Sequence, residues 1–372
     1  MATKSFARGF SLIELMVGVV IGLLVILIIG QFAADFEGQK RTSTGGSDAQ
    51  TNGMVALFTL EREIREAGFG LTGPAGSACS GINVSYSGTV VSNGAAIAPV
   101  RIIDGGASSD SITIAGGDTV LSTAPISMAG INLSGSPPTI SVDAVNGAAL
   151  KTRELILNTA AGKPTVLMLA AKNASKACTL LQLSSVSADN VTLSFAVGGS
   201  FPYNPSTLAA PPFATFPAYT ITDDMLIDLN RFDHKRYEIQ CDQLVASNPD
   251  AITAPNCNNT DPMASNIVFM KAQYGIAPIG SQTVNQWLDA TGATWANPVN
   301  ADIPRIKAVR LAIVARNSQY NRDTVTASPL TLWTDGGVPT KTMSLTADQQ
   351  HYRYKVFQTV VPIRNMIWAT KP

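Results

Sequence analysis

The sequence predicts an α+β protein in which one long N-terminal helix packs against a β-rich globular head. Three observations predict this class. An uncharged and strongly apolar run extends from Leu15 to Ile29, and helical periodicity returns between Met54 and Ala67. From Leu71 onward, short apolar runs alternate with clusters of Gly, Asn and Asp, which is the pattern of strands and turns.

The apolar run is long enough to cross a membrane. Counted as far as Ala34, it is interrupted only by Gln31. Twenty helical residues at about 1.5 Å each cover about 30 Å, which is the thickness of a hydrocarbon core. Because Lys4 and Arg8 precede the run without an acid, we expect the N-terminus to stay cytoplasmic and the remainder to be exported. The sequence thus predicts a single membrane-spanning helix over residues 10–34.

One carboxylate stands at the start of this apolar stretch. A charge at membrane depth costs roughly 2.5–3.5 kcal/mol on insertion scales, so Glu14 is expected to have a partner. The simpler alternative places Glu14 at the membrane surface, where the positive end of the helix favours it. Two other interpretations of the segment stay open at this point: a cleaved secretory signal, which should have a shorter apolar core, and a plain signal anchor.

The run from Arg8 to Met16 (RGFSLIELM) closely resembles the processing site of type IV prepilins and type II secretion pseudopilins. The resemblance implies that residues 1–9 are a leader, which prepilin peptidase removes by cutting between Gly9 and Phe10. It also implies methylation of the new Phe10 amine and an assembly role for Glu14, the fifth residue of the mature chain. In a buried bundle, Glu14 would neutralise the cationic N-terminus of a neighbouring subunit, since an unpaired charge there is costly.

Residues 35–70 are expected to form an exposed amphipathic helical region. Within it, Gly45 and Gly46 would each cost about 1 kcal/mol in an exposed helix, so the segment 43–53 could loosen it. Periodicity then predicts a half-helix that packs on the head and stops at residues 68–70. The residues expected on its packed face are Met54, Leu57, Phe58, Leu60, Ile64 and Ala67.

Two β-rich regions should follow, residues 71–220 as a candidate separate lobe and residues 221–372 as the C-terminal part of the head. The long loop expected at 199–217, rich in Pro and aromatic residues, could divide them. Strands are predicted within the segments 111–114, 166–169, 191–195, 309–316 and 352–357.

Several later blocks resemble the PilW family of minor pilins: the helix of residues 57–69, the Tyr-Gly-Ile block at 274–276, the strand 306–316 and the C-terminal blocks 353–357 and 362–366. Ala277 departs from the acid that this family often has after the Tyr-Gly-Ile block. The resemblance implies a pilin-like head and a role in priming or capping a type IV pilus, which would support motility, adhesion or DNA uptake.

The same resemblance implies the location and the partners. The chain would sit in the inner membrane with its head in the periplasm, and would then join the pilus at the cell surface. Its partners would be other minor pilins, the major pilin, prepilin peptidase, the inner-membrane assembly platform and a candidate tip adhesin. A J-like minor pseudopilin of type II secretion and a singly anchored exported binding protein are the alternatives.

The four cysteines all follow the apolar run, on the side where disulfides persist. Of the three possible pairings, the sequence favours the short Cys241–Cys257 loop, which contains an Asn-Pro-Asp turn, and this leaves Cys79 with Cys178. A zinc site is disfavoured because no Cys-x-x-Cys pair and no suitably spaced histidine occurs.

The composition argues against several functional classes. A net charge of zero lacks the basic signature of a nucleic-acid-binding protein, so no nucleic-acid partner is expected. No P-loop, Gly-x-Ser-x-Gly elbow or His-Glu-x-x-His motif occurs, and the two histidines, His234 and His351, lie in unremarkable local contexts. We therefore expect a structural protein with no catalytic residue, no metal and no cofactor.

Overall fold

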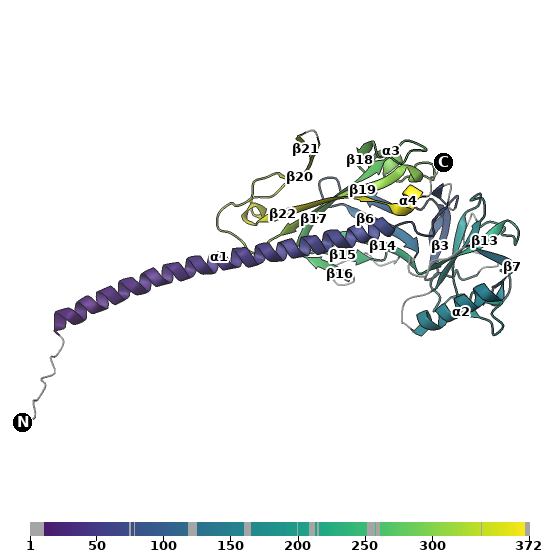
Figure 1. Ribbon diagram of the computed structural model, residues 1–372, viewed down its shortest axis with the longest axis horizontal. Coiled ribbons are helices and arrows are strands. Elements are labelled where there is room, and N and C mark those ends of the chain that lie inside the picture. The colour runs from purple at the N-terminus through teal and green to yellow at the C-terminus, as the bar shows by residue number, and fades with distance from the viewer. Residues whose placement is uncertain are drawn as a thin grey trace, which may run out of the picture.

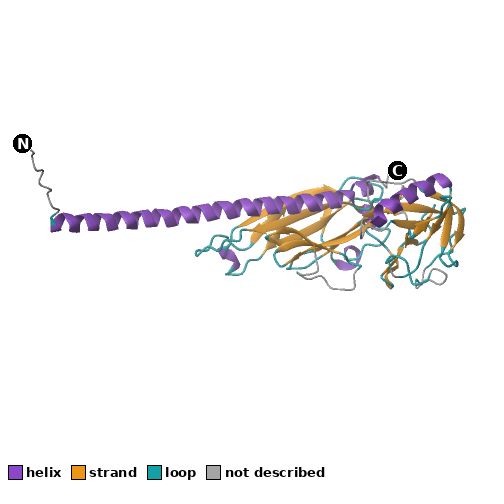
Figure 2. Cartoon of the chain, turned by 90° about the horizontal axis from the view of Figure 1, so that it is seen from below, coloured by secondary structure: helices purple, strands orange, loops and turns teal. Residues whose placement is uncertain are grey.

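One helix, α1 (Leu12–Glu66), projects far beyond a β-rich head that forms two lobes (Figures 1 and 2). The computed structural model describes residues 11–368 except 74–75, 78, 118–124, 160–164, 199, 208–212, 214–215, 251–256, 258–260 and 336. The predicted leader, including Gly9, and the predicted methylation site Phe10 lie outside the described residues. The α+β class with a long N-terminal helix is confirmed.

The lobe beside α1 contains two antiparallel sheets. The four-stranded sheet has the order β18 (Gln286–Leu288), β17 (Ile267–Ile276), β19 (Ile306–Arg316) and β22 (Tyr354–Pro362). The five-stranded sheet has the order β16 (Asp261–Ser265), β15 (Gln243–Ser247), β14 (Phe232–Gln240), β6 (Ser111–Gly117) and β5 (Val100–Ile103).

The second lobe contains a nine-stranded mixed sheet and the helix α2 (Ala144–Thr159). Its strand order is β11 (Ser185–Val186), β12 (Thr192–Ser194), β8 (Thr139–Val142), β7 (Ile126–Asn132), β13 (Asp224–Asn230), β9 (Val166–Ala171), β10 (Cys178–Gln182), β3 (Ile82–Tyr86) and β4 (Thr89–Ala95). Strands from both sides of residue 220 share sheets, since β13 joins this one while β5 and β6 join the other lobe.

Short elements complete the described chain. They are the ribbons β1 (Thr72–Gly73) with β2 (Gly76–Ser77) and β20 (Leu330–Asp335) with β21 (Val338–Met343), the helices α3 (Gly292–Trp295) and α4 (Arg364–Trp368), and the 3₁₀ turns η1 (Ile303–Arg305) and η2 (Gln349–His351). Each predicted strand segment overlaps an observed strand, and the described part of 199–217 holds no helix or strand. Helix α2 was not expected from the sequence.

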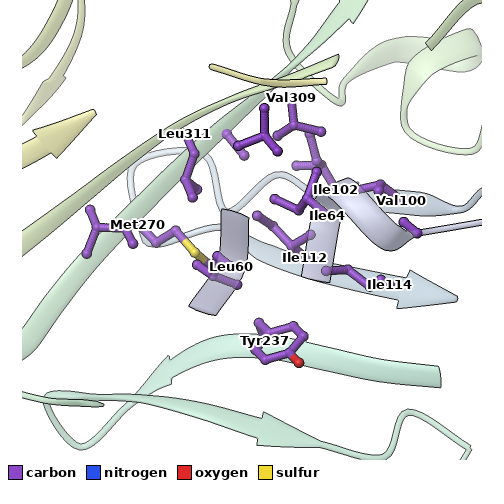
Figure 3. Close-up of a cluster of buried hydrophobic side chains, with 14 of the residues drawn as sticks. Leu60, Ile64, Val100, Ile102, Ile112, Ile114, Tyr237, Met270, Val309 and Leu311 are labelled. Atoms are coloured by element: carbon purple, nitrogen blue, oxygen red, sulfur yellow. The ribbon is translucent and has the colours of Figure 1, made fainter. Parts of the chain in front are cut away.

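The C-terminal half of α1 belongs to the core of the first lobe. Leu60 and Ile64 are fully buried among apolar side chains from β5, β6, β14, β17 and β19 (Figure 3). The predicted stop is confirmed, because α1 ends at Glu66 and both Gly68 and Gly70 adopt positive φ angles of 80° and 73°. The side chain of Asn365 donates hydrogen bonds to the carbonyl oxygens of Glu66 (3.0 Å) and Ala67 (2.9 Å), which ties this end to the head.

The helix is continuous through the segment that was expected to loosen it. The reason lies in the packing: a Cβ atom added at Gly45 would stand 2.1 Å from Asn317 Oδ1, and one added at Gly53 would stand 2.1 Å from Phe357 Cε2. These glycines let the helix approach the head more closely than any side chain would allow. The favourable packing along this seam offsets the propensity lost by placing glycine in a helix.

The face of α1 that packs on the head also differs from the face predicted by apolar periodicity. The buried stripe consists of small residues followed by larger ones, at intervals of three and four: Gly45, Ala49, Gly53, Ala56, Leu60, Ile64 and Ala67. Met54 and Phe58, which the apolar periodicity placed against the head, face outward and are 55% and 68% exposed. The expectation was wrong for these two because a count of large apolar residues overlooks a seam built from glycine and alanine.

Candidate functional site: the exposed half of the N-terminal helix

The N-terminal half of α1 makes no contact with the head. Its large apolar side chains from Leu12 to Phe36 are between 48% and 80% exposed, although their chemistry is that of a buried core. The most apolar 18-residue window has a mean hydropathy of 3.1, and α1 is the one helix among the described residues that is long and apolar enough to span a membrane. At about 1.5–3 kcal/mol for each fully buried side chain, leaving this stretch in water would cost on the order of tens of kcal/mol.

Glu14 lies in the first turn of α1 and completes a capping box. The backbone N–H of Ser11 donates to Glu14 Oε2 at 3.1 Å, and the N–H of Glu14 donates to Ser11 Oγ at 3.2 Å. Two N–H groups that have no partner within the helix are thereby satisfied. A carboxylate has about four acceptor positions, so this cap leaves room for a cationic partner from another chain. The capping role was not expected from the sequence, although Ser and Glu three residues apart are its usual signal.

Two of the glycines within the exposed half of α1 lie four positions apart. Gly18 and Gly22 have no atom within 4 Å of a Cβ built on either, so both lie on an open helix surface. Small residues four positions apart allow another helix to approach closely. The exposed half therefore combines an apolar surface, a site for close helix contact and one carboxylate at its start.

A second exposed apolar patch continues along α1 beside the head. Met54, Val55 and Phe58 are 55%, 45% and 68% exposed, on the side of the helix opposite the buried stripe. These residues lie beyond the predicted membrane span, so lipid tails do not explain their apolar character. A single exposed apolar residue is ordinary, but three neighbours on one helix face form a surface suited to contact with another protein.

The structure contains the disulfides Cys79–Cys178 and Cys241–Cys257, which are the two pairs that the sequence favoured. Cys79–Cys178 joins the start of the second lobe to β10, beside the pairing of β10 with β3. Cys241–Cys257 closes a short loop at the turn between β14 and β15. Both lie in the head and neither contains a residue of α1.

The two histidines have structural partners. His234 Nδ1 lies 2.8 Å from Asp250 Oδ1, and the two side chains are 20% and 1% exposed, so this histidine is largely enclosed by the head. His351 ends η2 and stacks on Tyr320, with ring centroids 4.9 Å apart. Within the described ranges, no group of three or more His, Cys, Asp or Glu side chains is placed to hold a metal ion.

Comparison with known proteins gives two family matches at opposite ends of the chain. Residues 4–30 match the prokaryotic N-terminal methylation motif, and residues 234–365 match the family described as type IV pilus-assembly protein W, PilW. No curated protein matches the chain.

Among solved structures, the chain is similar to a type IV-like pilin, TTHA1219, from Thermus thermophilus. The identity is 12% and the TM-score 0.25, over 60% of this chain and 96% of that one. The two family matches, over residues 4–30 and 234–365, support a role in type IV pilus assembly for a chain that carries the N-terminal methylation motif.

Proposed function

We propose that this chain is a minor pilin that enters the priming or tip complex of a type IV pilus by burying the exposed half of α1 among the helices of other subunits. Prepilin peptidase cuts between Gly9 and Phe10 and methylates the new amine. Until assembly, residues 10–34 hold the chain in the inner membrane with its head in the periplasm. The function is mechanical, and in the processing reaction the chain is the substrate.

The observation that carries the proposal is the contrast between the two halves of one continuous helix. From Gly45 onward the helix is fixed to the head by close backbone packing, whereas from Leu12 to Phe36 its apolar side chains have no partner within the described chain. Because the helix is continuous, burial of its exposed half among other subunits would also fix the position of the head, which is packed on the other half. The match to pilus-assembly protein W favours the pilus over the secretion pseudopilin.

Glu14 supplies the register of this assembly. In a lipid or fibre interior, its carboxylate and the methylated amine of a neighbouring Phe10 would each be costly alone, and pairing removes both costs. The carboxylate stands in the first turn of α1, on an exposed surface of the helix.

Other minor pilins and the major pilin are the proposed partners of the apolar half. The outward patch of Met54, Val55 and Phe58 extends the same contact beyond the membrane, where a sibling subunit would cover it during assembly. The assembly platform and a tip adhesin are further proposed partners, at opposite stages of fibre growth.

The experiment separates the charge of Glu14 from its capping role. Glu14→Gln keeps an oxygen that can accept from the Ser11 N–H but removes the charge, whereas Ser11→Ala removes the Oγ acceptor and keeps the charge. We expect Glu14→Gln to be processed normally yet to give few surface pili, and Ser11→Ala to assemble nearly as well as the unchanged chain. Surface piliation by Glu14→Gln at the level of the unchanged chain would refute the pairing role.

A further inference from the structure

Two loops lie at the end of the head from which the exposed half of α1 emerges. β22 runs alongside the helix: Lys355 Nζ donates to Gln50 Oε1 at 2.9 Å near its start, and Asn365, just beyond its end, contacts Glu66. The residues that precede β22 therefore lie toward the membrane side of the head, as Figure 1 also shows for the start of β22. The loop after β19 lies at the same end, because Asn317 packs against Gly45.

The two loops are joined to each other. The backbone N–H of Asn321 donates to the carbonyl oxygen of His351 at 2.9 Å, and that of Val325 donates to Gln350 at 3.0 Å. Tyr320 stacks on His351 with an interplanar angle of 20° and meets Tyr352 edge to face at 5.5 Å. Tyr320, His351 and Tyr352 thus form an aromatic cluster that joins the two loops.

This cluster carries a particular surface chemistry. Tyr320 is 54% exposed at the end of the stack, and the neighbouring Arg322 and Arg353 are exposed, as are the acids Asp323 and Asp348 of the same two loops. Behind them, the Arg316 guanidinium lies 4.7 Å from the Tyr352 ring centroid and pairs with Asp242, which braces the cluster from the head side. Exposed tyrosine beside arginine is the combination that settles at the headgroup level of a bilayer.

The cluster is within reach of the bilayer surface. If the span ends at Ala34, Gly45 stands eleven residues farther along the helix, or about 16 Å at about 1.5 Å per residue. From Asn317, which packs against Gly45, the three residues to Tyr320 can extend up to about 10 Å back toward the membrane and shorten this distance by that amount. The remaining gap of about 6 Å equals the headgroup layer, which is about 5–7 Å thick on each side of the hydrocarbon core.

We propose that the surface formed by Tyr320, Arg322, His351, Tyr352 and Arg353 docks on the anionic phospholipid headgroups of the membrane in which the chain is anchored. This inference rests on the proposed function, since it needs the anchored chain with its head outside the bilayer. Each arginine at such a surface is worth about a fivefold change in occupancy, from about 1 kcal/mol per cation. Docking sets the angle of the head before the chain leaves the membrane for the fibre, and releases when the chain is extracted.

The test adds one tryptophan at a time to the full chain and measures the quenching of its fluorescence by bromine. Each variant is reconstituted in vesicles of phosphatidylethanolamine and phosphatidylglycerol whose acyl chains are brominated near the glycerol end. Tyr320→Trp reports on the proposed surface. Ile279→Trp is the control, since Ile279 is 86% exposed and follows the end of β17 that pairs with Ile306, at the far end of the first lobe. Phe32→Trp reports on membrane insertion. Emission from the unchanged chain is subtracted from each.

We expect bromine to reduce the added emission of Tyr320→Trp and Phe32→Trp and to leave that of Ile279→Trp unchanged. Combining Tyr320→Trp with Arg322→Ser should restore part of the lost emission. Quenching at Phe32 without quenching at Tyr320 would overturn the docking surface and leave the anchor standing, as expected if a neighbouring subunit covers these loops instead. Absence of quenching at both positions would overturn the anchor and the docking surface together.

Discussion

The seam between α1 and the head makes a direct prediction about two glycines in the same helix. Gly46 is exposed, and a Cβ added there meets nothing within 4 Å, whereas a Cβ at Gly53 would lie 2.1 Å from Phe357 Cε2. Replacement by alanine gains about 1 kcal/mol of helix propensity at either position. At Gly53 the added methyl group must also displace the ring, and overpacking of this kind costs about 1–3 kcal/mol.

Gly46→Ala should therefore stabilise the chain by about 1 kcal/mol, and Gly53→Ala should leave it unchanged or destabilise it by up to about 2 kcal/mol. The two variants should differ by about 1–3 kcal/mol. The assay is urea unfolding of the chain lacking residues 1–35, followed by far-UV circular dichroism. The truncation is justified because the described side chains of residues 11–33 are all exposed and do not pack on the head.

A double-mutant cycle identifies the cause. If the ring of Phe357 is the obstacle, Gly53→Ala should cost less, or become stabilising, in a Phe357→Ala background, and the coupling energy should exceed about 0.5 kcal/mol. The reasoning is refuted if Gly53→Ala raises the urea midpoint as much as Gly46→Ala does.

Two further predictions concern the head. In the chain-entropy model, a disulfide that closes a loop of about 100 residues stabilises by about 4.7 kcal/mol, against about 3 kcal/mol for a loop of about 15 residues. The sequence separation is 99 for Cys79–Cys178 and 16 for Cys241–Cys257. Replacing both cysteines of the first pair by serine should therefore lower the melting temperature more than the same change in the second pair. The reverse order would contradict the loop-length argument. Burial raises the pKa of Tyr274 to about 12, so its contribution is complete below about pH 10 and is lost as the pH rises toward about 12, by up to about 1.4 kcal/mol per pH unit. Tyr274→Phe should show a smaller loss of unfolding free energy between about pH 10 and about pH 11.5 than the unchanged chain, and an equal loss would show that another group controls this range.

The fold was predictable where the sequence signal is local. The apolar run, the glycines after Glu66 and the alternation in the later strands each define an element by themselves. The sheet partners were not predictable, because β13 pairs with β7 and β9 across more than fifty residues and no local signal specifies that register. Helix α2 was missed because its sequence sits among strands and is only weakly amphipathic.

The packed face of α1 was the main error, and its physical reason is general. Apolar periodicity finds large side chains, but a seam of close approach is made of residues that lack them, such as Gly45 and Gly53. For the same reason, the sequence did not predict the exposed apolar patch that includes Met54 and Phe58, since both residues were expected to pack on the head. For the site itself, the motif around Glu14 predicted the position, and the structure added the capping box that Ser11 forms with it.

The account depends most on where the mature chain begins. Mass spectrometry of the protein purified from its native membrane measures the mass of the N-terminal peptide and any added methyl group. We predict a first residue of Phe10 carrying one N-methyl group, with the whole of α1 retained. A chain that keeps Met1, or one cut near Ala34, would contradict the prepilin processing and with it the assembly through Glu14.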